Sequence, residues 1–262
     1  MSIIEAILLG IIQGLTEFLP VSSSGHLELG KALLGIELEE NLSFTVVVHF
    51  ATVLSTITVF IKEINELIKG FFKFRWNDDM RYVMKLLLSA IPVLFVGLFF
   101  ENEVAALFEG NLFIVGGALL LTALLLALTN MIGKIQTRRI PFSDAFIMGV
   151  AQAVAVIPGI SRSGSTIATG LLLKNKREDV ARFSFLMVLI PIIGATLLKI
   201  MDWADTGMSG INPMTLVAGF LAAYISGFLA CKWMIGIVKK GKLIWFAAYC
   251  AVIGLIAILT SF

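Results

Sequence analysis

The sequence predicts an all-α integral membrane protein, with six transmembrane helices and two re-entrant helical hairpins that form an inverted-topology internal repeat. Apolar residues make up 58% of the 262 positions and charged residues 15%, against about 25% charged residues in a typical soluble domain. The charges lie between apolar runs, and an offset of 139 residues aligns the two halves of the chain. We therefore expect one membrane domain over residues 1–262, made of two inverted repeats at about 1–132 and 133–262.

Six segments have the length of about 20 apolar residues that a spanning helix needs. They cover residues 44–61, 83–100, 113–132, 183–200, 213–237 and 243–262. Two shorter apolar stretches, 2–19 and 143–157, run into Pro/Gly/Ser-rich loops, and a second short apolar piece follows each loop, near 26–35 and 165–173. This pattern predicts a re-entrant hairpin at both places, because a loop at membrane depth needs protein or water around it. Two ordinary helices, each broken by a proline, are the alternative.

The offset of 139 residues pairs polar and glycine positions of the two hairpins. The pairs include Gly10 with Gly149, Gln13 with Gln152, Ser22 with Ser161, Ser24 with Ser163, and Gly25 with Gly164. Each half then contains one hairpin and three spans, and an odd number of spans inverts the second half in the membrane. Inverted broken helices that meet near the midplane form the binding site of many transporters.

Basic and acidic connections alternate along the chain. Lys and Arg gather at 61–85, 134–139, 174–182 and 239–242, whereas acidic residues gather at 37–40, 101–109 and 202–205. Because basic connections stay in the cytoplasm, we expect the acidic connections and both termini on the external side. The net charge of +2 without a basic face predicts no nucleic-acid partner.

The first loop, PVSSSGH at 20–26, contains three hydroxyl groups between two ionisable residues, Glu17 and His26. Gln13 and Glu17 are four residues apart and share one face of a helix. An ionisable residue at membrane depth is a functional hypothesis, and a serine near a histidine and a carboxylate is the general pattern of an activated nucleophile. We expect His26 to act as acid or base, and Glu17 to orient His26 or to hold a cation.

The second loop, PGISRSGST at 158–166, offers one fixed cation, Arg162, among hydroxyl groups at the start of a helix. Helix N-termini bind phosphate readily, and the guanidinium fork suits phosphate oxygens. The two loops together predict a divided site, with the reactive groups in one loop and the anion ligands in the other. Its substrate has an anionic head and a lipid-compatible tail, as in a lipid phosphate or diphosphate.

The Gln-x-x-x-Glu sequence at 13–17, followed by PVSSSGH and PGISRSGST, resembles the undecaprenyl-pyrophosphate phosphatase family, the membrane proteins linked to bacitracin resistance. The resemblance covers essentially the whole chain. It implies hydrolysis of undecaprenyl diphosphate to undecaprenyl phosphate and inorganic phosphate, which recycles the lipid carrier of peptidoglycan synthesis. It also implies a multi-pass protein of the bacterial plasma (inner) membrane, an active site open to the periplasmic side and a long-chain polyprenyl diphosphate as the lipid partner.

The resemblance further implies roles for single residues. Glu17, Ser23, His26 and Arg162 are expected as catalytic residues, with Ser23 as the nucleophile. The expected phosphate-binding residues are Ser22, Ser24, Gly25, Ser161, Arg162, Ser163, Gly164 and Thr166. Many family members carry Glu where this chain has Gln13, which leaves Glu17 as the one carboxylate of the motif for a divalent cation such as Mg²⁺ or Ca²⁺.

Several questions stay open from the sequence. Ser23 either attacks phosphorus or only hydrogen-bonds phosphate while His26 activates water. Gln13 and Gln152 are expected as supporting residues that brace the hairpins, and His49 and Glu28 as satisfied polar residues, with a place in the cavity as the alternative. A transporter or flippase of a polyprenyl phosphate is the second functional hypothesis, although reactive groups in one loop only favour chemistry. The oligomeric state is undecided, with a homodimer among the options.

Overall fold

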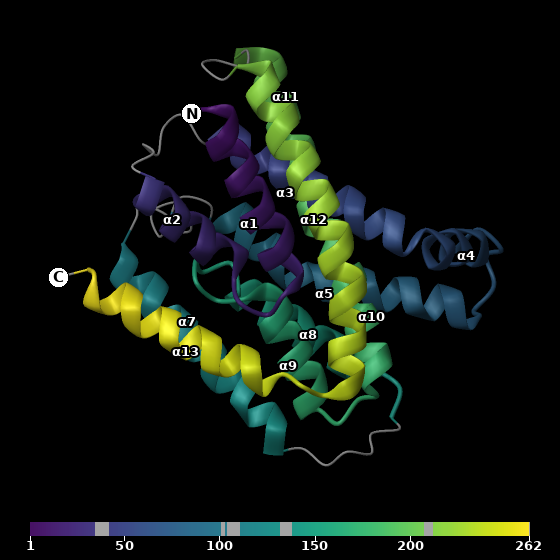
Figure 1. Cartoon of the computed structure of the whole chain (residues 1–262). Helices are drawn as coiled ribbons and strands as arrows, with labels where there is room; N and C mark the ends of the chain where they lie inside the picture. Colours follow the sequence, from purple (N-terminus) through teal and green to yellow (C-terminus); the bar gives the residue numbers. More distant parts are fainter. Residues whose placement is uncertain (35–41, 101–102, 104–110, 132–137, 207–211, 262) are drawn as a thin grey trace.

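The computed structural model describes residues 1–34, 42–100, 103, 111–131, 138–206 and 212–261. These residues form helices and turns, without a β-strand beyond one isolated bridge between Arg138 and Asn175. The helices are α1 (Ile3–Phe18), α2 (Ser23–Leu34), α3 (Leu42–Val59), α4 (Ile61–Phe71), α5 (Asp78–Phe99), α7 (Leu112–Leu128), α8 (Phe142–Val154), α9 (Arg162–Leu172), α10 (Arg177–Met187), α11 (Leu189–Thr206), α12 (Pro213–Lys240) and α13 (Ile244–Leu259). The all-α prediction is confirmed (Figure 1).

Within the described residues, four helical segments are long and apolar enough to cross a membrane. They are Asp78–Phe99, Leu112–Met131, Arg177–Leu198 and Pro213–Lys240. A fifth candidate is the pair Phe44–Val59 and Ile61–Phe71, which bends by 77° where α3 meets α4. The chain is therefore a multi-pass membrane protein with four to five candidate spans.

The sixth expected span, 243–262, coincides with α13, which has 16 residues. At 1.5 Å per residue such a helix covers about 24 Å, less than the roughly 30 Å of a hydrocarbon core. Six spans therefore stay a prediction. The acidic connections at 37–40 and 101–109 lie outside the described residues.

At both places where a hairpin is expected, the structure has two short helices joined by a turn; their re-entrant course in the membrane stays a prediction. α1 and α8 have 16 and 13 residues, and α2 and α9 have 12 and 11. The backbone turns sharply at Ser22 and Gly159, whose φ angles are 71° and 94°. The left-handed region costs little at glycine but is uncommon for serine, so Ser22 is held there by its surroundings.

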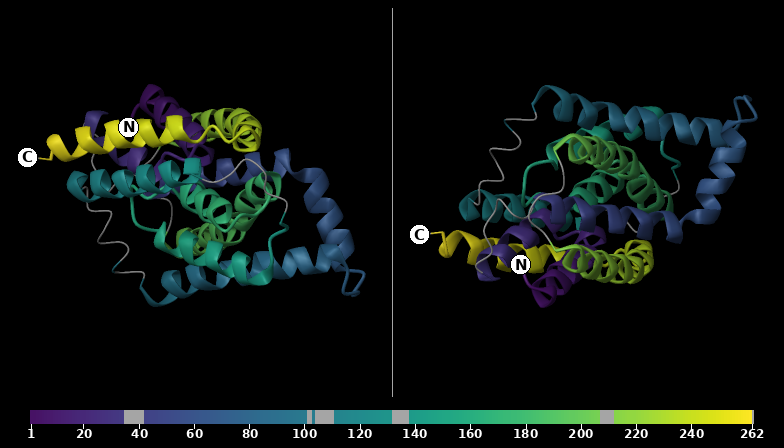
Figure 2. Two further views of the ribbon diagram at one scale, coloured as in Figure 1. Left: turned by 90° about the horizontal axis from the view of Figure 1, so that it is seen from below. Right: turned by 90° about the horizontal axis from the view of Figure 1, so that it is seen from above.

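The hairpins pack against helices from the other part of the chain. α1 packs on α12 and α8 on α5, while α7 and α13 lie side by side (Figures 1 and 2). A Cβ atom on Gly10 would lie 2.5 Å from the carbonyl oxygen of Gly219, and one on Gly149 would lie 2.4 Å from that of Ser89. Glycine is therefore needed at both positions for this close helix packing.

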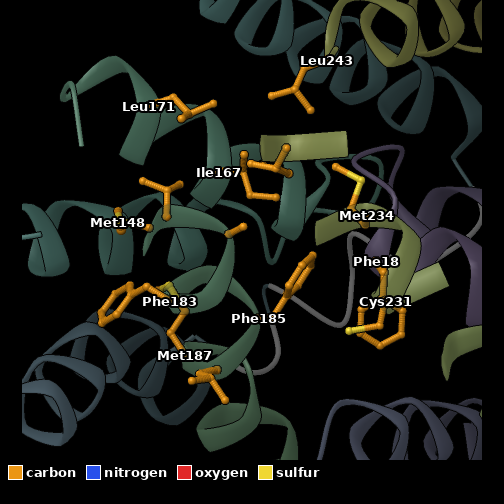
Figure 3. Packing of buried hydrophobic residues seen from close by; sticks show 14 of the residues in the cluster. Phe18, Met148, Ile167, Leu171, Phe183, Phe185, Met187, Cys231, Met234 and Leu243 are labelled. Atoms are coloured by element: carbon orange, nitrogen blue, oxygen red, sulfur yellow. The ribbon is translucent and has the colours of Figure 1, made fainter. Parts of the chain in front are cut away.

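A buried apolar cluster supports the tips of the hairpins (Figure 3). Phe18 at the end of α1 meets Phe185 of α10 edge to face, with ring centroids 5.8 Å apart. Ile167 of α9 and Met234 of α12 belong to the same cluster and are fully buried. The cluster thus fixes the last turn of α1 and the first turns of α9, which carry the candidate site residues. Helix α4 lies at the edge of the molecule (Figures 1 and 2), and its Ile64 and Leu67 pack against this cluster.

Candidate active site

The turns of the two hairpins contact each other directly. The Ser163 hydroxyl donates a hydrogen bond to the carbonyl oxygen of Leu19 at 3.0 Å. A Cβ atom on Gly25 would lie 3.2 Å from the Cα atom of Gly159, so a larger residue there would push the turns apart. Loops that are distant in sequence therefore meet at one place, as the sequence predicts.

The same serine cap opens both second helices of the hairpins. The Ser22 hydroxyl accepts a hydrogen bond from the Gly25 backbone N–H at 3.3 Å and lies 3.3 Å from the Ser24 hydroxyl. The Ser161 hydroxyl accepts a hydrogen bond from the Gly164 backbone N–H at 3.0 Å and lies 3.3 Å from the Ser163 hydroxyl. These caps satisfy N–H groups at the helix start, and they account for the serines at equivalent positions of the two loops.

Glu17 is the centre of the polar contacts between the hairpins. Its carboxylate accepts from Arg162 at 2.9 Å through Oε1, and from Ser23 at 2.6 Å and Gln13 at 2.9 Å through Oε2. The Glu17 side chain is 7% exposed, and charge-assisted hydrogen bonds of this kind offset the cost of burying a carboxylate. The structure thus brings together three of the four expected catalytic residues.

The hydrogen bonds described for His26 go to residues other than Glu17, Ser23 and Arg162. Its Nδ1 is 2.8 Å from the Ser22 carbonyl oxygen, and its Nε2 is 2.8 Å from the Tyr249 hydroxyl. The two rings also stack, with centroids 5.5 Å apart. Both ring nitrogens are therefore occupied, and among the described contacts Glu17 does not orient His26. The backbone bond to Ser22, one helical turn earlier, directs the ring towards α13.

His49 takes the place next to Glu17 that was expected for His26. Its Nε2 lies 3.8 Å from Glu17 Oε2, and its Nδ1 lies 2.8 Å from the carbonyl oxygen of Thr45. The sequence signal that could have placed His49 at the site is that it is a single ionisable residue inside an apolar helix. Glu28, the other residue of uncertain role, is buried in α2.

The Glu17–Arg162 ion pair borders a pocket. Its polar lining consists of Glu17, Thr52, Thr56, Gln152, Arg162, Ser163, Thr166 and Ser184. Its apolar lining consists of Phe18, Val53, Phe185, Val188, Leu189 and Ile192. Of the expected phosphate ligands, Ser163 and Thr166 thus reach this pocket together with Arg162.

The two supporting glutamines are both buried but differ in their partners. Gln13 donates to Glu17, and its Oε1 has no hydrogen-bond partner in the described part of the chain. Gln152 is 1% exposed, and neither its Oε1 nor its Nε2 has such a partner. The expected brace between the two side chains is therefore not made by a hydrogen bond among the described residues.

The donors around Glu17 allow a limited test for a metal ion. The described residues contain no group of three or more His, Cys, Asp or Glu side chains that would hold one. The Glu17 carboxylate and the unpartnered Gln13 Oε1 are oxygen ligands of the type that Mg²⁺ prefers, and Mg²⁺ commonly completes its shell with water and substrate phosphates. These residues fit a divalent cation only when phosphate oxygens supply most of the ligands.

Comparison with known proteins agrees with the motifs. Residues 6–256 match the family described as bacitracin resistance protein BacA. A Bacteroides thetaiotaomicron protein named undecaprenyl-diphosphatase is 56% identical over 264 residues, which cover 100% of both chains. A protein of the same name from Christiangramia forsetii is 52% identical over 264 residues, with 100% of this chain and 99% of the relative covered. A Methanosphaera stadtmanae protein of that name is 40% identical over 278 residues, with 100% of this chain and 99% of the relative covered. The chain therefore belongs to the bacitracin resistance protein BacA family.

Proposed function

We propose that this chain hydrolyses undecaprenyl diphosphate to undecaprenyl phosphate and inorganic phosphate, and thereby recycles the carrier lipid of peptidoglycan synthesis and confers bacitracin resistance. The contact that carries the proposal is the 2.6 Å hydrogen bond from the Ser23 hydroxyl to Glu17, with Arg162 on the other carboxylate oxygen. This is a hydroxyl next to a base, beside a fixed cation for the phosphate. Full-length relatives at 52–56% identity that are named undecaprenyl-diphosphatase support the same reaction.

Ser23 is the nucleophile in this proposal. Its Oγ forms a bond to the terminal phosphorus while its proton passes to Glu17 Oε2. The bond from this phosphorus to the bridging oxygen breaks, and the electron pair leaves with the lipid phosphate. Water then cleaves the phosphoserine and releases inorganic phosphate. In the alternative, Glu17 deprotonates water and the Ser23 hydroxyl only binds phosphate.

Arg162 neutralises the negative charge of the transferred group. Its hydrogen bond to Glu17 uses one of the five N–H groups of a guanidinium, so other N–H groups can bind phosphate oxygens at the same time. The side chain is 26% exposed, which lets it reach a substrate. The N-termini of α2 and α9 add backbone N–H groups at the same place. His26 is assigned to the proton transfers of phosphate release, where Tyr249 fixes its ring.

A divalent cation, Mg²⁺ or Ca²⁺, is proposed as a component of the substrate complex. Glu17 and Gln13 would hold it together with the diphosphate, and it would neutralise phosphate charge during transfer. Removal of divalent ions with EDTA should then lower phosphate release, and added Mg²⁺ or Ca²⁺ should restore it. Full activity after thorough chelation would contradict this role.

The proposed arrangement in the membrane has six spans and two re-entrant hairpins, related by inversion, in the bacterial plasma membrane. The packing of α1 on α12 and of α8 on α5 supports it, because the first helix of each hairpin then contacts a span of the other half. The basic connections lie in the cytoplasm and the active site opens to the periplasmic side, where the lipid diphosphate arises. Cysteine labelling of the 101–109 connection from outside the cell tests this orientation.

Phosphate release from a long-chain prenyl diphosphate in detergent tests the function. Ser23→Ala and Glu17→Gln should each lower the rate by about 10²- to 10⁴-fold, the usual contribution of acid–base catalysis. Ser89→Ala is a matched control, because among the described residues this buried serine donates its hydrogen bond to the Leu86 carbonyl oxygen within α5. Equal rates in all variants would refute the site. A native protein without hydrolysis, but with flux of labelled polyprenyl phosphate across liposomes, would favour the flippase.

A further inference from the structure

Gln152 on α8 is buried, yet its amide makes no hydrogen bond to any described residue. It is 1% exposed, and both Oε1 and Nε2 are unpartnered. More than about 90% of buried polar groups in proteins have a partner, so an amide with both ends unpaired is an exception that needs an explanation. The apolar residues that would fill this position more stably, such as leucine or methionine, are common elsewhere in the chain.

The surroundings of Gln152 indicate what kind of partner it lacks. Gln152 lines the same pocket as Glu17 and Arg162. The hydroxyl groups of this pocket have already donated their hydrogens. Thr52 donates to His49 O, Thr56 to Thr52 O, Thr166 to Arg162 O, Ser163 to Leu19 O and Ser184 to the Thr166 hydroxyl. The pocket therefore offers donors from Gln152 and Arg162, and acceptors from Gln152 Oε1, the Glu17 carboxylate and the hydroxyl lone pairs.

We propose that this pocket binds a partly protonated phosphate group, with Gln152 Nε2 donating to a phosphate oxygen and Gln152 Oε1 accepting from a P–OH. Arg162 supplies the positive charge. A phosphate that carries both P–O⁻ and P–OH matches this mixture of donors and acceptors, whereas an apolar tail would leave the amide unpaired.

The position of the pocket relative to Ser23 indicates which phosphate group occupies it. Arg162 contacts Glu17 Oε1, whereas Ser23 contacts Oε2 and does not line the pocket. The phosphate bound at Gln152 thus shares Arg162 and Glu17 with the proposed reaction site at Ser23. It is either the terminal phosphate of the lipid diphosphate or the inorganic phosphate that is released, and this assignment rests on the proposed hydrolysis.

Gln152→Met is the primary test, because methionine has a similar length and no hydrogen-bonding amide; Gln152→Leu is the second variant. The control is Thr196→Val, a buried change one turn beyond the pocket on α11. The full chain in detergent is assayed for hydrolysis of a long-chain prenyl diphosphate, for inhibition by inorganic phosphate, and for thermal unfolding with and without inorganic phosphate.

We expect Gln152→Met to unfold at a higher temperature than the native chain without phosphate, because a buried unpaired amide is removed. We expect its affinity for phosphate to fall about 10-fold, the effect of one hydrogen bond to a charged group. A higher KM identifies the lipid phosphate as the ligand, and a higher inhibition constant with unchanged KM identifies inorganic phosphate.

Unchanged KM, inhibition constant and phosphate-induced stabilisation in both folded variants would overturn the proposal. This result is distinct from a failure of the proposed function. If the native chain releases no phosphate from the lipid, the function fails, but loss of phosphate-induced stabilisation in Gln152→Met would still establish the binding site.

Discussion

Glu17 and Arg162 form one ion pair, but removal of Arg162 should destabilise the fold more than removal of Glu17. The Glu17 side chain is 7% exposed and that of Arg162 is 26% exposed, with 2.9 Å between Oε1 and the guanidinium nitrogen. Removal of one partner from a buried pair typically costs about 3–5 kcal/mol, because the other charge stays buried without compensation. Arg162→Met leaves the more deeply buried charge, so we expect about 3 kcal/mol. Glu17→Gln leaves a guanidinium that reaches solvent, so we expect about 1 kcal/mol after discounting for screening.

A double-mutant cycle measures this asymmetry. For a domain of this size, 1 kcal/mol shifts the unfolding midpoint by roughly 2–4 °C, so Arg162→Met should unfold about 6–12 °C below the native chain in detergent. The double variant should be more stable than Arg162→Met alone, because no charge is then left unpaired. Strictly additive midpoints, or a larger loss for Glu17→Gln than for Arg162→Met, would refute the buried-pair explanation.

Three further predictions concern other contacts. In a thermal unfolding assay, Gly10→Ala and Gly149→Ala should each destabilise the fold by about 1–3 kcal/mol, because their Cβ atoms would lie 2.5 Å and 2.4 Å from facing carbonyl oxygens. In the same assay Gly117→Ala, whose Cβ atom would have nothing within 4 Å, should be neutral or stabilising by up to ~1 kcal/mol. Tyr249→Phe keeps the ring stack but removes the hydroxyl at 2.8 Å from His26 Nε2, so kcat should fall several-fold and the pH–rate profile should change while the unfolding midpoint stays close to that of the native chain. A Tyr249→Phe enzyme with an unaltered pH profile would remove His26 from the proton transfers.

Much of the fold follows from short-range patterns. Uninterrupted apolar runs predict the long helices, and proline, glycine and serine between short runs predict the two hairpins, which the structure has at α1–α2 and α8–α9. The contact between Ser23 and Glu17 also follows from local geometry, because a tight turn brings positions six apart together. The contact between Glu17 and Arg162 spans 145 residues, and the repeat predicted that their loops would meet.

The direction of side chains within the site was less predictable. His26 and His49 both lie on short-range helical patterns, but the rotation of α2 and α3 about their axes decides which one reaches Glu17. That rotation depends on tertiary packing, such as the contact of α2 with Tyr249, 223 residues away. The pairing state of Gln152 is equally non-local, because its neighbours come from α1, α3, α9 and α10.

Equivalent positions of the two loops contact the same carboxylate, that of Glu17. Ser23 and Arg162 are the first residues of α2 and α9, and the offset of 139 residues places one on the other. Ser23 donates to Glu17 Oε2 and Arg162 to Oε1, so equivalent positions of the repeat reach the two oxygens of a single residue. Two helix N-termini directed at one point favour an anion there, which stabilises the buried carboxylate and, beside it, a phosphate group. With serine at one of these two positions and arginine at the other, the anion site has the hydroxyl group and the cation that the proposed hydrolysis uses.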